Sequence, residues 1–267
     1  MSIPIGITLR NMGTQSTPEL LAHCAAKAEA AGLHSIWVVD HIAIPPDDAE
    51  GSGGRYLDPL ATLAWLGAQT RKIMLGTAIL VLPYRPALPT AKWIATLQEL
   101  TGERLILGTG IGWMKPEFDA LGVPLKDRAK ISEETLQFLN DAFANDVVTA
   151  NGQDFLFKPR PKKPPILIGG DHPHATDRAV RLCDGWFPMR NDPAKLAPQI
   201  NAYKDAAAAA GKPASVTTFA RVDDPDDFRD KVKALEDAGV DMLVASVPYD
   251  TADEFSAGLQ TMMDALG

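Results

Sequence analysis

The chain has 267 residues, of which 46% are hydrophobic and 22% are charged. This is the composition of a folded globular protein, and it excludes an intrinsically disordered one. The 26 basic and 34 acidic residues give a formal net charge of −8, which argues against a nucleic-acid partner. Two cysteines, Cys24 and Cys183, are too few for a disulfide scaffold and fit the reducing cytoplasm, where we expect the protein.

We expect no membrane partner either. No apolar run in the sequence reaches the length of a membrane-spanning helix. Residues 1–9 lack a basic region and are interrupted by Pro4, so we do not expect a secretory signal there.

In chain order, the sequence repeats one pattern: a short apolar run, a loop and an amphipathic helix. Helix starts are marked by a capping residue before a proline, as in Thr17-Pro18 and Asp224-Pro225. The expected strands are residues 3–9, 35–40, 73–82, 104–108, 165–168, 185–187, 215–220 and 242–247. The expected helices are residues 18–31, 58–69, 88–100, 126–144, 175–182, 194–210 and 225–238, and a last helix closes the chain.

This alternation predicts a single α/β domain over residues 1–267. Strands that alternate with helices form a parallel sheet, and continuously apolar runs indicate strands with both faces buried. Eight such units have the size of a (β/α)8 TIM barrel, and a doubly wound open sheet is the alternative. Residues 111–164 are expected to form an insertion after the fourth strand and a lid on the C-terminal face. A barrel carries its active site at that face, where the strands end.

The first candidate residues, Asp40 and His41, stand where the second strand opens into a loop. Histidine is the side chain best suited to proton transfer near neutral pH. The adjacent carboxylate could orient the imidazole or accept a hydrogen bond from a cofactor ring. The alternative is a hydrogen-bonded structural pair at the end of a strand.

Two glycine-rich turns follow later strands. In the turn of residues 108–112, Gly108, Gly110 and Gly112 would let the backbone approach a flat or phosphorylated ligand, although tight turns alone would also require them. Gly169 and Gly170 precede a helix, and free N–H groups at a helix N-terminus bind anions. His172 and His174 have no third ligand nearby, so no metal site is expected.

Taken in order, these segments resemble the luciferase-like flavin and deazaflavin oxidoreductases over nearly the whole chain, most of all the enzymes that use coenzyme F420. The residues that carry the resemblance are 35–41, 75–77, 83–86, 104–113 with Glu117-Phe118, 166–170, and Asp184-Gly185-Trp186.

The resemblance implies a TIM barrel with coenzyme F420 across its mouth. It implies an oxidoreductase that transfers a hydride between the deazaflavin and a small organic substrate, with His41 as proton donor and Asp40 in contact with the ring. It also implies a non-proline cis peptide near Thr77-Ala78. The other implied cofactor contacts are Thr77, Ala78, Gly110, Ile111, Gly112, Gly169, Gly170, Ala175 and Thr176.

The substrate pocket is assigned to Trp113, Glu117 and Trp186, with Trp37 as a further candidate wall that suits the core better. F420-dependent sugar-phosphate dehydrogenases of this family carry a catalytic glutamate where Trp113 stands and an asparagine where Pro116 stands. That specific activity is therefore not expected. For Glu117, a structural role is an equal alternative.

Two other functions stay open at this point. The first is an FMN-dependent monooxygenase on the same fold, because FMN and F420 share the ring and the first phosphate. The second is a non-redox barrel that binds a phosphate ligand. Arg55, Arg160, Lys162 and Lys163 could reach the polyanionic tail of F420 or could be solvated surface charges. A homodimer is the assembly considered, with a small-molecule substrate as partner.

Overall fold

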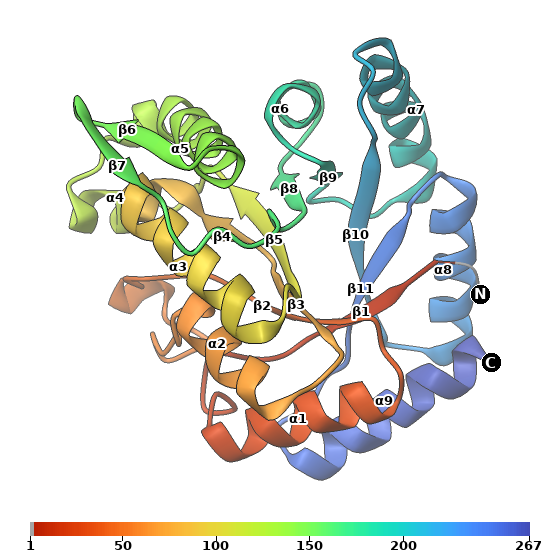
Figure 1. Cartoon of the computed structure of the whole chain (residues 1–267). Helices are drawn as coiled ribbons and strands as arrows, with labels where there is room; N and C mark the ends of the chain where they lie inside the picture. Colours follow the sequence, from red (N-terminus) through yellow and green to blue (C-terminus); the bar gives the residue numbers. More distant parts are fainter. Residues whose placement is uncertain (1–2) are drawn as a thin grey trace.

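The computed structural model describes residues 3–267, and its centre is a closed barrel of eight parallel strands (Figure 1). The expected TIM barrel is therefore confirmed, and the open sheet is excluded. Each strand pairs with the next around the barrel, and β1 closes it against β11. The barrel strands are β1 (Ile5–Thr8), β2 (Ser35–Val38), β3 (Met74–Thr77), β5 (Leu105–Gly110), β8 (Ile166–Gly169), β9 (Gly185–Phe187), β10 (Ser215–Arg221) and β11 (Met242–Ser246).

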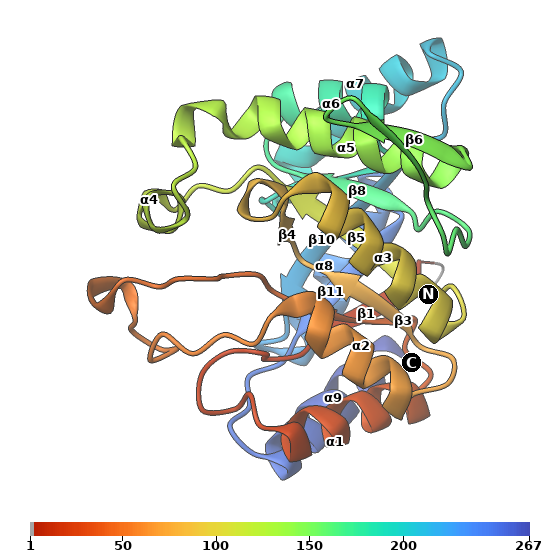
Figure 2. The same cartoon turned by 60° about the vertical axis from the view of Figure 1, so that its left-hand side comes forward.

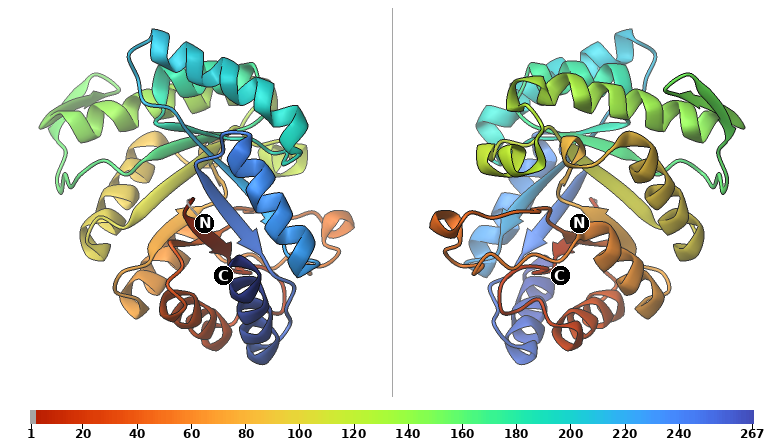
Figure 3. Two further views of the ribbon diagram at one scale, coloured as in Figure 1. Left: turned by 90° about the vertical axis from the view of Figure 1, so that its right-hand side faces the viewer. Right: turned by 90° about the vertical axis from the view of Figure 1, so that its left-hand side faces the viewer.

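Helices surround the strands (Figure 3), and five of those in the described residues begin at a side-chain cap. The Thr17 hydroxyl accepts the Leu20 N–H, and Thr251 forms a reciprocal capping box with Glu254. No helix within residues 3–267 is both long and apolar enough to span a membrane. The ring consists of α1 (Pro18–Ala30), α2 (Pro59–Gln69), α3 (Ala87–Thr101), α5 (Arg128–Ala144), α6 (His174–Leu182), α7 (Pro193–Ala209), α8 (Pro225–Asp237) and α9 (Ala252–Leu266).

The strands are continuously apolar because each of their two faces meets a core. On β2, Ile36 and Val38 pack outward in the core beneath the helices, whereas Trp37 points into the barrel. The Trp37 ring meets Phe187 edge to face, with 5.8 Å between the ring centroids. A side chain at Gly76 would collide with the Trp37 ring, so this glycine makes room for it. Trp37 is therefore core and not a wall of the site.

The third expected strand, residues 73–82, is interrupted. β3 ends at Thr77, a non-proline cis peptide joins Ala78 to Ile79, and β4 (Leu80–Val81) continues against the end of β5. The cis peptide thus lies one residue after the predicted position. The Ile79 side chain fills the space above Gly110, where any Cβ would collide with it.

The segment 111–164 divides between three places, so only part of the expected lid lies at the barrel mouth. Residues 111–127, which include α4 (Lys115–Leu121) and η3 (Leu125–Asp127), lie at the end toward which the strands point (Figure 2). α5 is an ordinary ring helix between α3 and α6, because its apolar face must be buried. A hairpin of β6 (Val147–Ala150) and β7 (Gln153–Leu156), which the sequence did not predict, follows it.

The exit from this hairpin runs along the outside of α3 toward the opposite end of the barrel. The Gln98 side chain donates to the Lys162 carbonyl oxygen, and the Lys162 N–H donates to the Glu103 carboxylate. Both contacts lie at the C-terminal end of α3, which is remote from the mouth. The lid role therefore stays a prediction for residues 111–127 alone.

Candidate active site

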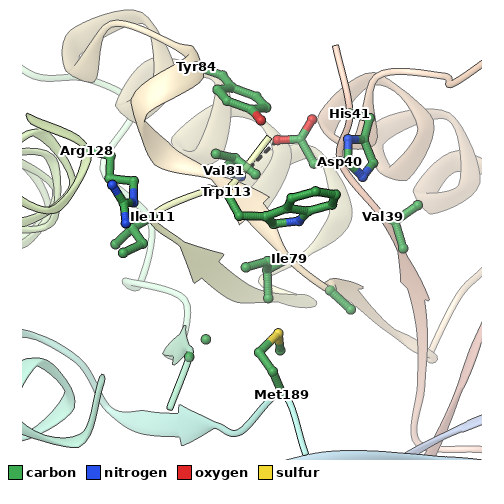
Figure 4. Close-up of a pocket in the computed structure, with 14 residues that line it drawn as sticks. Val39, Asp40, His41, Ile79, Val81, Tyr84, Ile111, Trp113, Arg128 and Met189 are labelled. Atoms are coloured by element: carbon green, nitrogen blue, oxygen red, sulfur yellow. Dashed lines mark hydrogen bonds between the residues drawn. The ribbon is translucent and has the colours of Figure 1, made fainter. Parts of the chain in front are cut away.

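A cavity of about 440 Å³ opens at the C-terminal ends of the strands (Figure 4). It gathers residues from the loops after β2, β5, β8 and β9 and from the bulge between β3 and β4, as a barrel predicts. Its lining residues are Val39, Asp40, His41, Ala78, Ile79, Val81, Tyr84, Ile111, Gly112, Trp113, Arg128, Gly169, Gly170 and Met189. Eight of these are residues that the sequence assigned to the site: Asp40, His41, Ala78, Ile111, Gly112, Trp113, Gly169 and Gly170.

His41 is held by a carboxylate from a separate helix, α4. Its Nδ1 lies 2.9 Å from Oε2 of Glu117, which α4 carries to this position. The His41 side chain is 21% exposed and that of Glu117 is fully buried. This pair leaves Nε2 as the imidazole nitrogen that can exchange a proton with a ligand.

The buried Glu117 carboxylate is saturated with hydrogen bonds. Oε1 accepts the N–H groups of Ile42 at 2.6 Å and Ala43 at 3.0 Å, and Oε2 accepts the Tyr84 hydroxyl at 2.6 Å. Burial alone raises the pKa of a carboxyl group, but these bonds and the His41 contact outweigh it and hold the pKa of Glu117 below its ordinary value. Glu117 is therefore an anion behind the cavity wall, and it does not line the substrate pocket as assigned.

Asp40 does not orient its neighbour His41. Its carboxylate accepts two hydrogen bonds from Arg85, at 2.7 and 2.9 Å, and the Val81 N–H at 2.9 Å. Arg85 also pairs with Asp58. Both Asp40 oxygens are thus engaged within the protein, and the side chain is fully buried. Asp40 fixes β4 beneath the cavity, so the direct contact of Asp40 with a cofactor ring stays a prediction.

The glycines at the end of β5 and in the turn that follows have two different roles. The space above Gly110 is filled by Ile79, so Gly110 supports the cavity floor from below and is not among the lining residues. Gly112 lines the cavity, and its φ of 76° is a conformation that favours glycine. Thr77 lies beneath the floor too, fully buried, and its hydroxyl donates to the Gly108 carbonyl.

The turn between β8 and α6 presents Gly169 and Gly170 to the cavity, and Gly170 has a φ of 131°. The two residues expected to follow them as anion contacts are less available. Ala175 and Thr176 are buried, the Ala175 N–H donates to the Asp171 carbonyl, and the Thr176 hydroxyl donates to the Pro173 carbonyl.

Arg128 is a site residue that sequence reasoning missed. It stands at the start of α5 and lines the same cavity as Gly169 and Gly170. Its Nη1 donates to the Leu125 carbonyl, whereas its buried Nε has no hydrogen-bond partner among residues 3–267. In the view of Figure 4, Arg128 and His41 lie on opposite sides of the cavity. A cation at a helix N-terminus opposes the helix dipole, and this is the signal that could have identified it.

Aromatic side chains flank His41 at the mouth. The Tyr56 ring lies 4.9 Å from the imidazole and the Trp113 ring 6.3 Å from it, between ring centroids. Trp113 is 73% exposed, so it can cover a ligand. Trp186, which was expected in this wall, is not among the residues that line the cavity. It is fully buried against Tyr203, and its Nε1–H donates to the Gly170 carbonyl, so it supports the turn from behind.

Three of the four basic residues considered for a long anionic tail have partners elsewhere, and Lys162 is exposed. Arg55 donates to Ser16, Arg160 pairs with Asp146, and Lys163 pairs with Asp184. Across the described part of the chain, no three His, Cys, Asp or Glu side chains converge as a metal site.

The comparisons with known proteins agree with this geometry. The sequence model of the family described as luciferase-like monooxygenase matches residues 1–222. An uncharacterized protein of Mycobacterium tuberculosis is 32% identical over 246 residues, which are 84% of each chain.

Relatives with named activities use two kinds of cofactor. An F420-dependent glucose-6-phosphate dehydrogenase of Kineococcus radiotolerans is 31% identical over 195 residues, 69% of this chain and 56% of the relative. An FMNH2-dependent dimethylsulfone monooxygenase of Pseudomonas putida is 34% identical over 155 residues, 54% of this chain and 42% of the relative. Among solved structures, the monooxygenase RslO1 of Streptomyces bottropensis superposes with a TM-score of 0.84 at 19% identity, over 99% of this chain and 98% of that one, which shows the shared fold.

Proposed function

The chain belongs to the luciferase-like monooxygenase family, and from that membership we propose that it is a coenzyme F420-dependent oxidoreductase. It transfers a hydride between the deazaflavin and a small organic substrate, with His41 as the proton donor. The observation that carries the proposal is one cavity with a histidine–carboxylate pair at one side. At the other side it has two glycines and an arginine whose Nε lacks a hydrogen-bond partner among residues 3–267.

The residues present fit a flat, phosphorylated cofactor. Gly169, Gly170 and the incompletely bonded guanidinium of Arg128 would hold its first phosphate, because glycine admits close approach and arginine donates to phosphate in pairs. Ala78 and Ile79 would lie beneath the ring. Coenzyme F420, when bound, supplies a ring carbon that gives or accepts a hydride.

The chain's own residues orient the substrate and manage the proton. His41 lies at the mouth with Nε2 available, between the rings of Tyr56 and Trp113. Trp113 shields the site from water and gives the substrate an apolar wall. This wall stands where the sugar-phosphate dehydrogenases carry a catalytic glutamate, so the proposed substrate is a small organic molecule of a different kind.

An FMN-dependent monooxygenase is the second candidate, supported by the Pseudomonas relative and by the fold of the Streptomyces monooxygenase. F420 is preferred because the relative named for it matches a larger share of this chain, 69% against 54%. A non-redox barrel that binds a phosphate ligand is the third candidate.

Titration of the purified protein with F420 and with FMN, followed by absorbance and by quenching of tryptophan fluorescence, separates the three. We expect saturable binding of F420 and weaker binding of FMN. The reverse order would favour the monooxygenase. Binding of inorganic phosphate with neither cofactor would favour the non-redox barrel.

The role of His41 is tested by His41→Ala. General acid catalysis is worth roughly 10² to 10⁴ in rate, so kcat should fall by at least about 10²-fold while the Kd for F420 changes little. A variant that keeps its turnover would exclude His41 as the proton donor.

We further propose that the enzyme is cytoplasmic and homodimeric. The free thiols of Cys24 and Cys183 are both buried, which suits a reducing compartment, and burial raises the pKa of each to about 12. The homodimer rests on the exposed apolar side chains of Trp93 and Leu100 on α3, beside α2.

A further inference from the structure

We propose that Glu117 is a positioning residue that fixes the tautomer of His41, with the hydrogen on Nδ1, and that Tyr84 holds Glu117 in place. The proposal rests on the proposed role of His41 and adds to it the group that decides which imidazole nitrogen faces the substrate. It concerns residues that approach from three separate elements: the loop after β2, η2 (Leu82–Tyr84) and α4.

The first step is the charge of Glu117. Its carboxylate accepts three hydrogen bonds, two from backbone N–H groups and one from Tyr84, and Oε2 also lies 2.9 Å from Nδ1 of His41. The donors around the carboxylate favour its charged form and hold the pKa of Glu117 below its ordinary value. Glu117 therefore stays ionised, and an ionised carboxylate requires that Nδ1 of His41 be the donor.

The second step is the difference between the hydrogen-bond partners of the two carboxylate oxygens. Oε1 faces only N–H groups of the main chain, at Ile42 and Ala43. A main-chain N–H group can only donate, so both groups require an acceptor oxygen at the position of Oε1. Oε2 faces the His41 ring and the Tyr84 hydroxyl, and both of these can either donate or accept.

The other ionisable groups near this cluster do not compete for His41. Arg85 and Asp40 form their own bidentate pair behind Tyr84, and Arg85 also reaches Asp58. Burial and the neighbouring Glu117 carboxylate raise the pKa of Tyr84 well above its ordinary value, so the phenol keeps its hydrogen and donates it to Glu117. His41 is left with one charged partner.

The consequence is specific for the variant Glu117→Gln. The amide oxygen must take the place of Oε1, because only an oxygen can accept the two main-chain N–H groups. The amide NH₂ then faces His41 and donates to Nδ1. Nδ1 has to accept, so the ring hydrogen moves to Nε2, and the nitrogen offered to the substrate changes from an acceptor to a donor.

The experiment is NMR of the protein labelled with ¹⁵N-histidine, in which the nitrogen shifts and the couplings to the ring protons distinguish the two tautomers. The His41 signals are assigned by their loss in His41→Ala. In the alkaline limit, where the imidazole is neutral, we expect the Nδ1–H tautomer in the wild type and the Nε2–H tautomer in Glu117→Gln.

Two matched variants serve as controls. Tyr84→Phe removes one hydrogen bond but leaves the carboxylate, so it should keep the Nδ1–H tautomer. Asp119→Asn changes an exposed carboxylate on the same helix and should alter neither tautomer nor turnover. In Glu117→Gln we expect kcat to fall on the order of 10²-fold with the Kd for cofactor within about twofold. His41 donates from Nε2 as the imidazolium, and loss of the carboxylate that stabilises this form impairs proton transfer and not binding.

An Nε2–H tautomer in the wild type overturns the proposal without any variant, and so does an Nδ1–H tautomer in a folded Glu117→Gln protein. The tautomer is measured without cofactor or turnover. If neither F420 nor FMN binds, the proposed function fails while the tautomer measurement still decides the role of Glu117.

Discussion

Arg128 occupies a position that costs electrostatic free energy. It carries a positive charge at the N-terminus of α5, and its Nε is buried without a hydrogen-bond partner among the described residues. A bound anion would satisfy the guanidinium and remove the repulsion from the helix dipole. We therefore expect the cavity to bind an anionic ligand at the edge where Arg128 lies.

This leads to a prediction for Arg128→Ala. Hydrogen bonds to charged groups contribute about 1.5–3 kcal/mol, so the Kd for F420 should rise about 10- to 100-fold. Isothermal titration at two salt concentrations checks it, because the affinity of the wild type should fall more steeply with salt than that of the variant. Lys130→Gln, an exposed change on the same helix, is the control. Equal Kd values for Arg128→Ala and wild type would contradict an anion site here.

Glu117 gives the protein a predicted pH dependence of stability. Its pKa is lower in the folded chain than in the unfolded one, so the ionised carboxylate stabilises the fold above the ordinary pKa of glutamate. That contribution is lost as the pH falls through the lower, folded-state pKa.

Urea unfolding of Glu117→Gln therefore should show the largest loss of free energy near pH 7. The loss should become smaller as the pH falls from the ordinary pKa of glutamate, about 4.3, toward the lower pKa of the folded state. Asp119→Asn should show little change at either pH. A loss in Glu117→Gln that stays constant across this range would mean that the buried charge does not stabilise the fold.

At the scale of elements, the floor of the cavity depends on the fit between β5 and the bulge after β3. Gly110 has no side chain, and Ile79 occupies that space from the bulge between β3 and β4. Asp40 and Arg85 hold the other side of the bulge through the Val81 N–H. The floor is thus fixed from two elements at once, which suits a surface that must stay flat beneath a ring.

Gly110→Ala should destabilise the protein by about 1–3 kcal/mol, the usual cost of overpacking a core. Ile79→Ala should remove the collision, so the double variant should be more stable than the sum of the two single effects. Thermal and urea unfolding of the four proteins complete a double-mutant cycle, in which a coupling free energy below about 0.5 kcal/mol would show that the two residues do not meet.

At the scale of the whole molecule, the apolar surface is unevenly distributed. Four large apolar side chains are exposed on two neighbouring helices: Trp65 on α2, and Leu88, Trp93 and Leu100 on α3. Trp93 and Leu100 line a groove between the two helices, whereas Trp65 and Leu88 line separate grooves. An apolar groove of this kind often marks an association surface, and a second copy of the chain could cover the same groove on both subunits.

We therefore expect light scattering after gel filtration to give twice the 28.7 kDa of one chain. Trp93→Glu should shift the protein toward the monomer, because a charge in an apolar interface is not solvated. Val147→Glu, an exposed apolar residue on β6, is the matched control and should leave the assembly unchanged. A monomeric wild type at all concentrations would contradict the homodimer.

The sequence pattern is enough to predict the barrel and to place the candidate site at the ends of its strands. Apolar runs that alternate with capped helices leave few arrangements in which both faces of each strand are buried. Parallel strands in a closed barrel end at one face, so Asp40, His41, Gly112 and Gly170 could be placed together from their positions at strand ends. These are consequences of local pattern and of chain connectivity.

Which side chains pair depends on how elements that are far apart in the sequence pack together. His41 meets Glu117, 76 positions away, and not its neighbour Asp40, which pairs with Arg85. Arg128, which was not expected, lines the cavity, and Trp186, which was expected there, is buried in the core. Local periodicity specifies which face of an element is buried, but a hydrogen bond depends on distances of a few tenths of an ångström between elements that are far apart in the sequence. Those distances are set by how all the elements pack at once.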